Sequence, residues 1–507
     1  MTKIEYLSMS KPQRAFHGFI DFFANLPRKT GRLVSRLPRK TGQLVQKVVK
    51  PFYNIYDAVL HGDWRTRLSV LLMGFGQFTR GQQIRGVLYF VYEAFFVTFM
   101  ALFGFKYLSG LGTLGQLAEV TIKVDGIRTS YYYDNSFEIL IYSIVTIAFI
   151  VIAAYLWYSQ LVDSIKLQRY GYVGKKFSNK QTLSSIVNQN YDKTLMAIPM
   201  FGLTLFTIIP TVIMILIGFT NYSSAHLTPK SLVDWVGLQN FEKVFGGVGS
   251  DGSLFLYAFG MVLLWTLIWA FFATFSNYFL GMFVAMIINS KGIKLKKLWR
   301  TVLVTTIAVP QFISLLLMNR MLNTDVGIFN EWLEELGWIS TGIPWLNSPI
   351  LSKVVIILVN TWIGIPYTML ICTGLLMNIP TDLYESAKID GAGPFKTYTK
   401  ITLPYMLFVT TPYLISQFVG NINNFNVIYL LSGGNPLFTN LGSDTILASL
   451  GQTDLLITWI YKISLTNVSK DYGFASVLGL LIFVVVAFFS LIFFNRSSSM
   501  KDEEEFQ

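Results

Sequence analysis

The chain has 507 residues, of which 53% are hydrophobic and 13% are charged, and its mean hydropathy is +0.50. Soluble globular chains carry roughly a quarter charged residues, so this composition excludes an ordinary water-soluble protein and indicates one that is solvated by a membrane. The formal net charge of +12 is typical of cytoplasmic loops beside anionic lipid. No zinc-finger spacing or aromatic-basic motif accompanies the charge, so we expect no nucleic-acid partner.

The chain begins with a polar, basic segment that lacks the apolar core and cleavage site of a removable signal peptide. After it come eight apolar stretches, each long enough to cross the hydrocarbon core as a helix. They are residues 86–108, 137–158, 195–219, 257–287, 301–322, 353–377, 405–431 and 474–495. A ninth stretch, 68–78, is too short to cross and predicts an interfacial or re-entrant segment.

Charge indicates how these spans are oriented. Lys and Arg gather before the first span and in the loops after the second and fourth, whereas the loop after the fifth span is acidic. Lys and Arg favour the cytoplasmic side of short loops, so we expect a multi-pass protein of the cytoplasmic membrane with both termini in the cytoplasm. The predicted domains are a basic cytoplasmic segment 1–67, N-terminal transmembrane helices with a cytoplasmic loop 68–190, a transmembrane core 191–496 and a cytoplasmic tail 497–507.

The basic segment contains an internal duplication, residues 26–34 and 37–45. It suits either a docking element or a solvated basic tail near anionic headgroups, and the composition favours the tail.

The loop between the sixth and seventh predicted spans is the most informative segment of the chain. Asp382, with Glu385 three residues later, resembles a capping box at a helix start. Gly391 and Gly393 predict a left-handed stop, and Pro394 prevents continuation. The resulting helix of about two turns is marginal by itself, so we expect it to dock into a partner protein.

The spacing of Glu385-Ser-Ala, Gly391, Ile401 and Leu403-Pro404 resembles the EAA loop of the permeases of ATP-binding cassette (ABC) importers. In that family the loop is a coupling helix that sits in a cleft of the ATPase subunit. By this resemblance, the residues that couple to the ATPase are Glu385, Ser386, Ala387, Asp390 and Gly391.

From about residue 195 onward the chain resembles the MalF-type permeases of maltose and maltodextrin importers, through segments 359–367, 390–395 and 421–425. The resemblance implies an all-α polytopic fold with the MetI-like core of type I importer permeases. Gram-negative relatives insert a large domain between the third and fourth spans, whereas loop 220–256 is short here, as in the Gram-positive version of the family.

The resemblance also implies what this chain does and with what. It would be a non-enzymatic permease subunit that passes maltodextrin-type oligosaccharides into the cytoplasm by alternating access, and it would itself hold no cofactor. ATP and Mg²⁺ would be bound by a dimeric ABC ATPase. The other expected partners are a second, homologous MalG-type permease, an extracytoplasmic solute-binding protein, the oligosaccharide and membrane lipid.

The seventh predicted span contains Asn421, Asn423, Asn424 and Asn426, although polar side chains are rare in membrane spans. At about 100° per residue, Asn421 and Asn424 share one face and the other two lie towards another. One face can offer amides to sugar hydroxyls, and the other can bond neighbouring helices. The resemblance assigns the solute to Asn421 and Asn424.

The sixth span places Asn360, Gly364 and Tyr367 on one face, at i, i+4 and i+7. Helix packing around Gly364 and Pro366 is the alternative interpretation, but the resemblance matches all three to sugar-contacting positions. Gln311 in the fifth span completes the predicted site. The maltose permease has a small hydroxyl residue there, so we expect this pocket to differ and to admit a longer glucan.

Features elsewhere in the sequence bear on three classes of function: an ABC permease, an ion-coupled transporter and a membrane enzyme. The chain has no phosphate-binding Gly-x-x-x-x-Gly-Lys-Ser/Thr loop and its three histidines form no metal pattern, so energy must come from another polypeptide. An ion-coupled secondary transporter needs ionisable residues within the spans, and Glu93 is the main one; we expect it to bond within the N-terminal helices. An ABC permease for a different oligosaccharide is a further alternative, and a membrane enzyme lacks any visible catalytic constellation.

Overall fold

The computed structural model describes residues 54–56, 58–117, 121–124, 127–130, 133–174, 178–179, 184, 191–227, 231–245, 252–290, 292–439, 441, 445–466 and 470–496. The duplicated basic segment and the predicted tail 497–507 lie outside the described residues. The chain divides into two compact units, Met1–Ile213 and Met214–Gln507, and each is described by itself.

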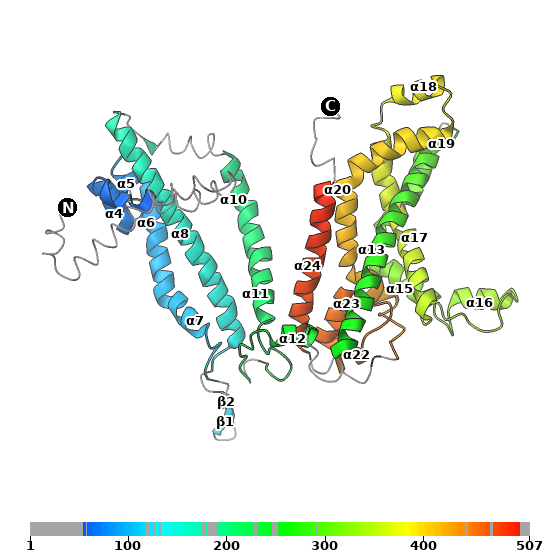
Figure 1. The fold of residues 1–507 in the computed structure, drawn as a ribbon, viewed down its shortest axis with the longest axis horizontal. Coiled ribbons are helices and arrows are strands. Elements are labelled where there is room, and N and C mark those ends of the chain that lie inside the picture. Colours follow the sequence, from blue (N-terminus) through cyan, green and yellow to red (C-terminus); the bar gives the residue numbers. More distant parts are fainter. Residues whose placement is uncertain are drawn as a thin grey trace. The chain divides into compact units, whose positions relative to one another are not determined.

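Unit 1 is built from helices that follow one another along the chain (Figure 1). They are α4 (Trp64–Leu71), α5 (Phe75–Phe78), α6 (Gln83–Phe99), a π-helical turn (Met100–Gly104), α7 (Phe105–Gly110), α8 (Ser136–Tyr172), α10 (Tyr191–Leu203) and a second π-helical turn (Thr204–Ile208). A two-stranded antiparallel hairpin, β1 (Thr121–Val124) and β2 (Ile127–Ser130), precedes α8. This hairpin departs from the predicted all-helical fold, and two isolated β-bridges, Thr220 with Trp235 and Leu437 with Gly451, occur elsewhere in the described residues.

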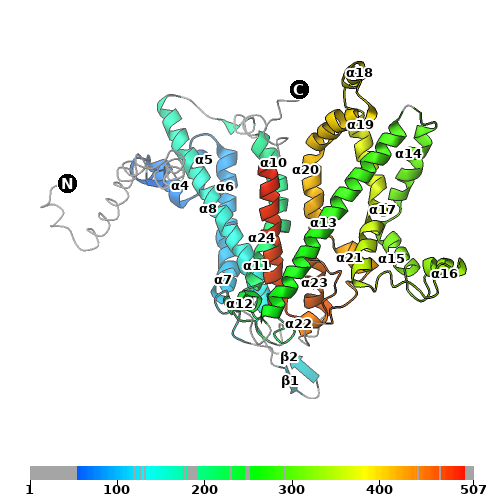
Figure 2. The same cartoon turned by 45° about the vertical axis from the view of Figure 1, so that its right-hand side comes forward.

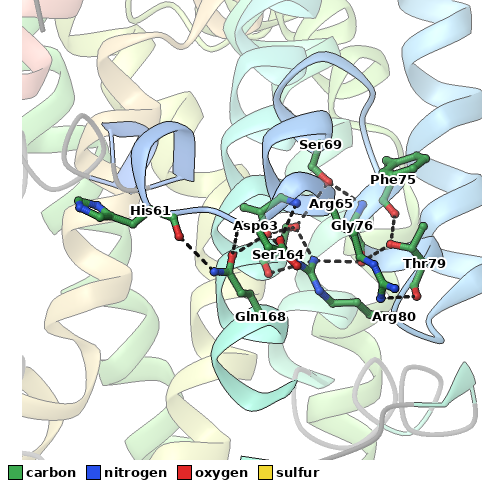
Figure 3. Close-up of polar contacts among 11 residues, drawn as sticks. His61, Asp63, Arg65, Ser69, Phe75, Gly76, Thr79, Arg80, Ser164 and Gln168 are labelled. Carbon is green, nitrogen blue, oxygen red and sulfur yellow. Dashed lines mark hydrogen bonds and ion pairs between the residues drawn. The ribbon is translucent and has the colours of Figure 1, made fainter. Parts of the chain in front are cut away.

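A polar cluster holds the start of unit 1 together (Figure 3). Asp63 caps α4 by accepting the N–H of Thr66 at 2.9 Å, and it forms an ion pair with Arg80. Arg80 also donates to the hydroxyl of Thr66 at 2.8 Å and to that of Ser164, on α8, at 3.0 Å. Since Thr66 and Ser164 are fully buried, these bonds satisfy polar groups that would otherwise destabilise the packing of α4 and α5 on α8.

The turn between α4 and α5 lies in the stretch 68–78 and is fixed by side chains from the two long helices. Glu93 of α6 accepts the N–H of Met73 at 2.7 Å, and Gln160 of α8 donates to the carbonyl of Ser69 at 2.7 Å. The prediction that Glu93 bonds within the N-terminal helices is therefore confirmed.

Unit 2 holds the remaining elements, beginning within α11 (Ile209–Ile217). They continue with α12 (Gln239–Phe245), α13 (Gly252–Asn289), α14 (Lys296–Thr305) with a 3₁₀ turn (Thr306–Ala308), α15 (Gln311–Met321), α16 (Ile328–Glu335), α17 (Pro349–Leu376), α18 (Thr381–Ile389) and α19 (Pro394–Thr397). A π-helical turn (Tyr398–Thr402) leads into α20 (Leu403–Ile422), followed by α21 (Phe425–Leu431), α22 (Thr445–Ala448), α23 (Leu456–Tyr461), another π-helical turn (Lys462–Thr466) and α24 (Tyr472–Arg496).

The long helix α13 organises unit 2, because it packs against both α17 and α20 (Figure 2). Its buried aromatic side chains carry polar atoms that need partners. The indole N–H of Trp269 donates to the backbone carbonyl of Asn421 at 3.1 Å, and the hydroxyls of Tyr278 and Thr410 lie 2.8 Å apart. These bonds fix α20 against α13 within an otherwise apolar core.

Within the described residues, six helices are long and apolar enough to cross a membrane: Gln83–Gly110, Ser136–Tyr172, Thr194–Ile217, Leu254–Asn289, Pro349–Leu376 and Tyr472–Ile492. A seventh results if Lys296–Ala308 and Gln311–Met321, which meet at 85°, count as one bent span. The remaining predicted span, 405–431, contains α20, whose 20 residues suffice for the hydrocarbon core but include several Thr, Gln and Asn side chains that lower its hydropathy. The predicted polytopic helical fold is confirmed.

Two predicted spans differ in detail from the structure. The fifth, 301–322, is not a straight helix, because Pro310 has no N–H to continue the ladder and α15 starts afresh after it. The seventh, 405–431, is interrupted after Ile422, where the side chain of Asn424 accepts the N–H of Val427 at 3.3 Å and caps the new helix α21.

Candidate functional site

Unit 2 contains a cavity of about 600 Å³ bounded by α13, α17, α20 and the bend between α14 and α15. The structure brings all six residues predicted to contact solute to its wall, although they come from three separate spans. They are Gln311, Asn360, Gly364, Tyr367, Asn421 and Asn424. The volume is within the range of roughly 300–1,000 Å³ that is typical of small-molecule pockets.

The wall formed by α17 is shaped by its contact with α13. Asn360 is buried, whereas Tyr367 is 51% exposed. Gly364 faces Asn277 of α13, and a Cβ at this position would overlap the side-chain amide of Asn277. Glycine is therefore required for the close approach of the two helices, besides leaving room beside the cavity.

The α20 wall carries the asparagine pair. The side-chain amide of Asn421 donates to the hydroxyl of Thr274 at 3.0 Å. The side-chain amide of Asn424 in turn donates to the side-chain oxygen of Asn421 at 3.3 Å. Asn421 and Asn424 share one side, as predicted, even though the helix breaks between them. Asn423 and Asn426 are exposed and do not line the cavity.

Sequence reasoning missed a second polar row, on α13. Thr274 and Asn277 line the cavity beside the predicted residues Asn421 and Gly364. Asn277 donates to the carbonyl of Ala273 at 2.8 Å, while its own side-chain carbonyl oxygen is buried without a hydrogen-bond partner among the described residues. Gln417, one turn before Asn421 on α20, also reaches the wall. The signal was present, since Thr274 and Asn277 are polar residues at i and i+3 in an apolar helix, but such residues equally suit bonds between helices.

The predicted coupling segment forms a separate short helix, α18, which lies apart from the packed spans (Figures 1 and 2). Gly391 adopts a left-handed φ of +70°, and the N–H of Ala392 bonds the carbonyl of Ala387, so the predicted stop at Gly391 is confirmed. The predicted cap is wrong. Pro380 occupies the N-cap position, and Asp382 lies within the first turn without capping it.

The second glycine of this segment was also misplaced. Gly393 has an extended backbone, with φ −71° and ψ 167°, and it is the N-cap residue of α19 rather than part of the stop. Pro394 does not only end a helix; it opens the next one, because its fixed φ suits the first helical position.

The exposed side of α18 could engage a partner. Glu385, Ser386 and Asp390 are all exposed, whereas Ala387 is buried against the protein. The helix is tied to the start of α20 by the hydroxyls of Tyr384 and Thr402, which lie 3.1 Å apart. Large apolar side chains are also exposed in this segment, namely Leu383 (45%), Ile389 (87%) and Phe395 (78%).

Comparison with known proteins identifies the family. Residues 277–499 match the family described as binding-protein-dependent transport system inner membrane component. The galactooligosaccharides transport system permease protein GanP of Bacillus subtilis is 33% identical over 438 residues, which cover 86% of this chain and 98% of GanP. The maltodextrin transport system permease protein MalC of Streptococcus pneumoniae is 32% identical over 454 residues, which cover 87% of this chain and 97% of MalC.

The maltose/maltodextrin transport system permease protein MalF of Escherichia coli is 34% identical over 273 residues, but these cover only 54% of this chain and 51% of MalF. In this chain the segment between α11 and α13 contains one short described helix, α12, which agrees with the predicted short loop. Because GanP and MalC are matched over nearly their whole length, this chain belongs to the family of binding-protein-dependent transport system inner membrane components and is a multi-span membrane permease.

Proposed function

We propose that this chain is the permease subunit of an ABC importer that passes maltodextrin-type oligosaccharides through the cavity in unit 2. The observation that carries the proposal is the convergence of six residues, chosen from sequence alone, on one cavity wall. Asparagine amides both donate and accept hydrogen bonds, so Asn360, Asn421 and Asn424 suit sugar hydroxyls, while Tyr367 adds a flat apolar ring for a sugar face.

The relatives favour an oligosaccharide, and two sugar classes compete. GanP and MalC are named for galactooligosaccharides and maltodextrins, at nearly equal identity to this chain. We place maltodextrins first because the segments with Asn360 and Asn421 resemble the maltodextrin permeases. Galactooligosaccharides are the second candidate, and sugar competition separates the two.

Transport through this cavity needs other proteins. The solute would arrive from an extracytoplasmic binding protein, a second homologous permease would complete the pathway, and a dimeric ABC ATPase would bind ATP and Mg²⁺ and hydrolyse the nucleotide. In this arrangement α18, with Glu385 on its exposed side, sits in a cleft of the ATPase. This chain hydrolyses nothing itself, and both of its termini and α18 are cytoplasmic, as the Lys and Arg distribution predicts.

The proposal is tested by uptake of radiolabelled maltotriose into proteoliposomes that contain this permease with its ATPase, partner permease and binding protein. Asn421→Ala weakens uptake, since the amide that faces the solute is lost, while the matched control Asn423→Ala retains it because Asn423 is exposed away from the cavity.

The coupling role is tested in the same vesicles. Glu385→Lys abolishes ATP-dependent uptake, whereas the same charge change at Glu331, on α16, leaves uptake intact. If galactooligosaccharides compete and maltotriose does not, the second candidate replaces the first. Uptake that continues without any ATPase refutes the proposed function.

A further inference from the structure

The short helix α16 is divided lengthwise into an apolar and an acidic half. At about 100° per residue, Ile328, Trp332 and Leu336 fall on one side. Three carboxylates continue around the rest of the helix, one of them, Glu334, opposite Trp332, and another, Glu335, at the border next to Ile328. The carboxylates belong to Glu331, Glu334 and Glu335.

No part of the chain that the structure describes covers the apolar half of α16. Trp332 is 53% exposed and Leu336, which follows the helix directly, is 62% exposed; Trp338, just beyond, is 75% exposed. An exposed apolar surface of this kind marks an interaction site or a membrane-contacting site.

The helix is nevertheless held firmly in place. Asn330, which is buried, donates to the carbonyls of Asn323, Thr324 and Ile343 at 3.0–3.3 Å and accepts the N–H of Ile343 and the indole N–H of Trp345. Its one side chain therefore closes the loop between α15 and α17. The exposed tryptophans are presented on a preformed support and do not belong to a loose loop.

The position of α16 indicates what covers it. It extends sideways from the long helices, across their direction, near the end of α17 that lies away from α18 (Figures 1 and 2). In a protein whose long helices span a membrane, a helix in this place runs along the membrane surface. Tryptophan is enriched at this level of the bilayer, where its ring lies among the headgroups and its N–H stays hydrated.

We propose that α16 is an interfacial helix that rests on the lipid surface. Trp332, Leu336 and Trp338 enter the headgroup region, and the carboxylates face water. Interfacial helices bury their apolar face to a depth of about 5–10 Å. The acidic face gives no attraction to anionic lipid, so apolar burial and the Asn330 support hold the helix there. The inference depends only on the chain spanning a membrane and not on which solute it carries.

The depth of two opposite positions tests the proposal. Cys372 is the only cysteine of the chain, so a Cys372→Ser background allows one nitroxide label at a time, at Trp332→Cys or at Glu334→Cys, which lie on opposite halves of α16. A third variant, Phe488→Cys, labels an exposed position of α24 as the lipid reference. The complete importer in lipid nanodiscs is then examined for collision of each label with oxygen, which partitions into lipid, and with a water-soluble nickel chelate.

We expect the ratio of oxygen to nickel collisions to be several-fold higher at position 332 than at position 334, and to approach that of position 488. Equal, water-like ratios at 332 and 334 overturn the proposal. So does a label at 332 that is shielded from both reagents when the solute-binding protein is added, because that outcome identifies a protein as the occupant of the face. Uptake by each labelled variant shows independently that the importer is intact.

Discussion

Replacing Gly364 by alanine tests whether the contact between α13 and α17 shapes the cavity. The added Cβ would overlap the amide of Asn277, so that amide must rotate away from α17. The rotation breaks its bond to the carbonyl of Ala273, worth about 1 kcal/mol, and overpacking adds about 1–3 kcal/mol. Asn277 lines the cavity, so the displaced amide enters the space that the solute would occupy.

The expected result is weaker solute binding with a folded protein. The broken bond and the overpacking together cost about 2–4 kcal/mol. Since 1.4 kcal/mol corresponds to a factor of ten in affinity, binding weakens by about tenfold when half of this cost is lost from the binding free energy. The matched control is Gly374→Ala on the same helix, where a Cβ would meet nothing within 4 Å. The concentration dependence of uptake in proteoliposomes, with thermal unfolding of the purified variants, measures both effects.

A second change separates the clash from a general defect of α17. In the double variant Gly364→Ala, Asn277→Ala the overlapping amide is gone, so the packing recovers. Solute affinity then recovers in part, limited by any contact that Asn277 itself makes with the solute. The reasoning is refuted if Gly364→Ala behaves like Gly374→Ala, because the two glycines would then be equivalent.

Three further predictions concern other parts of the molecule. Asn330→Ala leaves several buried groups without a hydrogen-bond partner, at a cost of about 1–3 kcal/mol each. Hydrogen exchange is expected to become faster in residues 322–349 while α13 stays protected. Unchanged exchange in that segment contradicts the role of Asn330. Lys462→Met removes the cation that bonds the fully buried Asp454 at 2.6 Å, a loss of about 3–5 kcal/mol. Burial already raises the pKa of the Asp454 carboxyl even with Lys462 beside it. Without Lys462, protonation of Asp454 at lower pH removes the unpaired buried charge and restores stability to the variant. Thermal unfolding measured across a range of pH tests this expectation. Burial raises the pKa of the Asp63 carboxyl, but the bonds from Thr66 and Arg80 together lower it further, so its pKa lies below the ordinary value of 3.8. The stability that Asp63 contributes to unit 1 is therefore present above pH 3.8 and is lost as the pH falls below it. Asp63→Asn removes this pH dependence, which is measured by the rate of proteolysis of unit 1.

The polytopic fold follows from composition and run length, because lipid solvation demands long apolar helices. The breaks do not follow from these signals. The end of α20 at Ile422 depends on Asn424 turning its side chain to the N–H of Val427, and the four clustered asparagines fit two faces of an uninterrupted helix equally well. At α18 the helix begins at Thr381, directly after Pro380, whose ψ of 130° is non-helical, so Asp382 falls within the first turn.

The candidate site shows the same division. Asn360, Gly364 and Tyr367 share a helical face, which spacing alone predicts, and their likeness to family positions selected that face among several. Asn277 was missed because its importance arises from tertiary contact. Only the packing of α13 on α17 brings its amide against Gly364, 87 positions along the chain, and no periodicity within either helix contains that information.

The hydrogen bonds along α20 suggest how α18 and the cavity influence each other. At one end, Thr402 meets Tyr384 of α18; further along, Thr410 meets Tyr278; and near the other end Asn421 meets Thr274. The last two bonds both join α20 to α13, so these helices form one body with the cavity on its wall. A displacement of α18 therefore pulls on the same helix that presents Asn421 to the solute. Because α13 also packs closely on α17 at Gly364, a rotation of α20 and α13 that changes the width of the cavity has to loosen that contact.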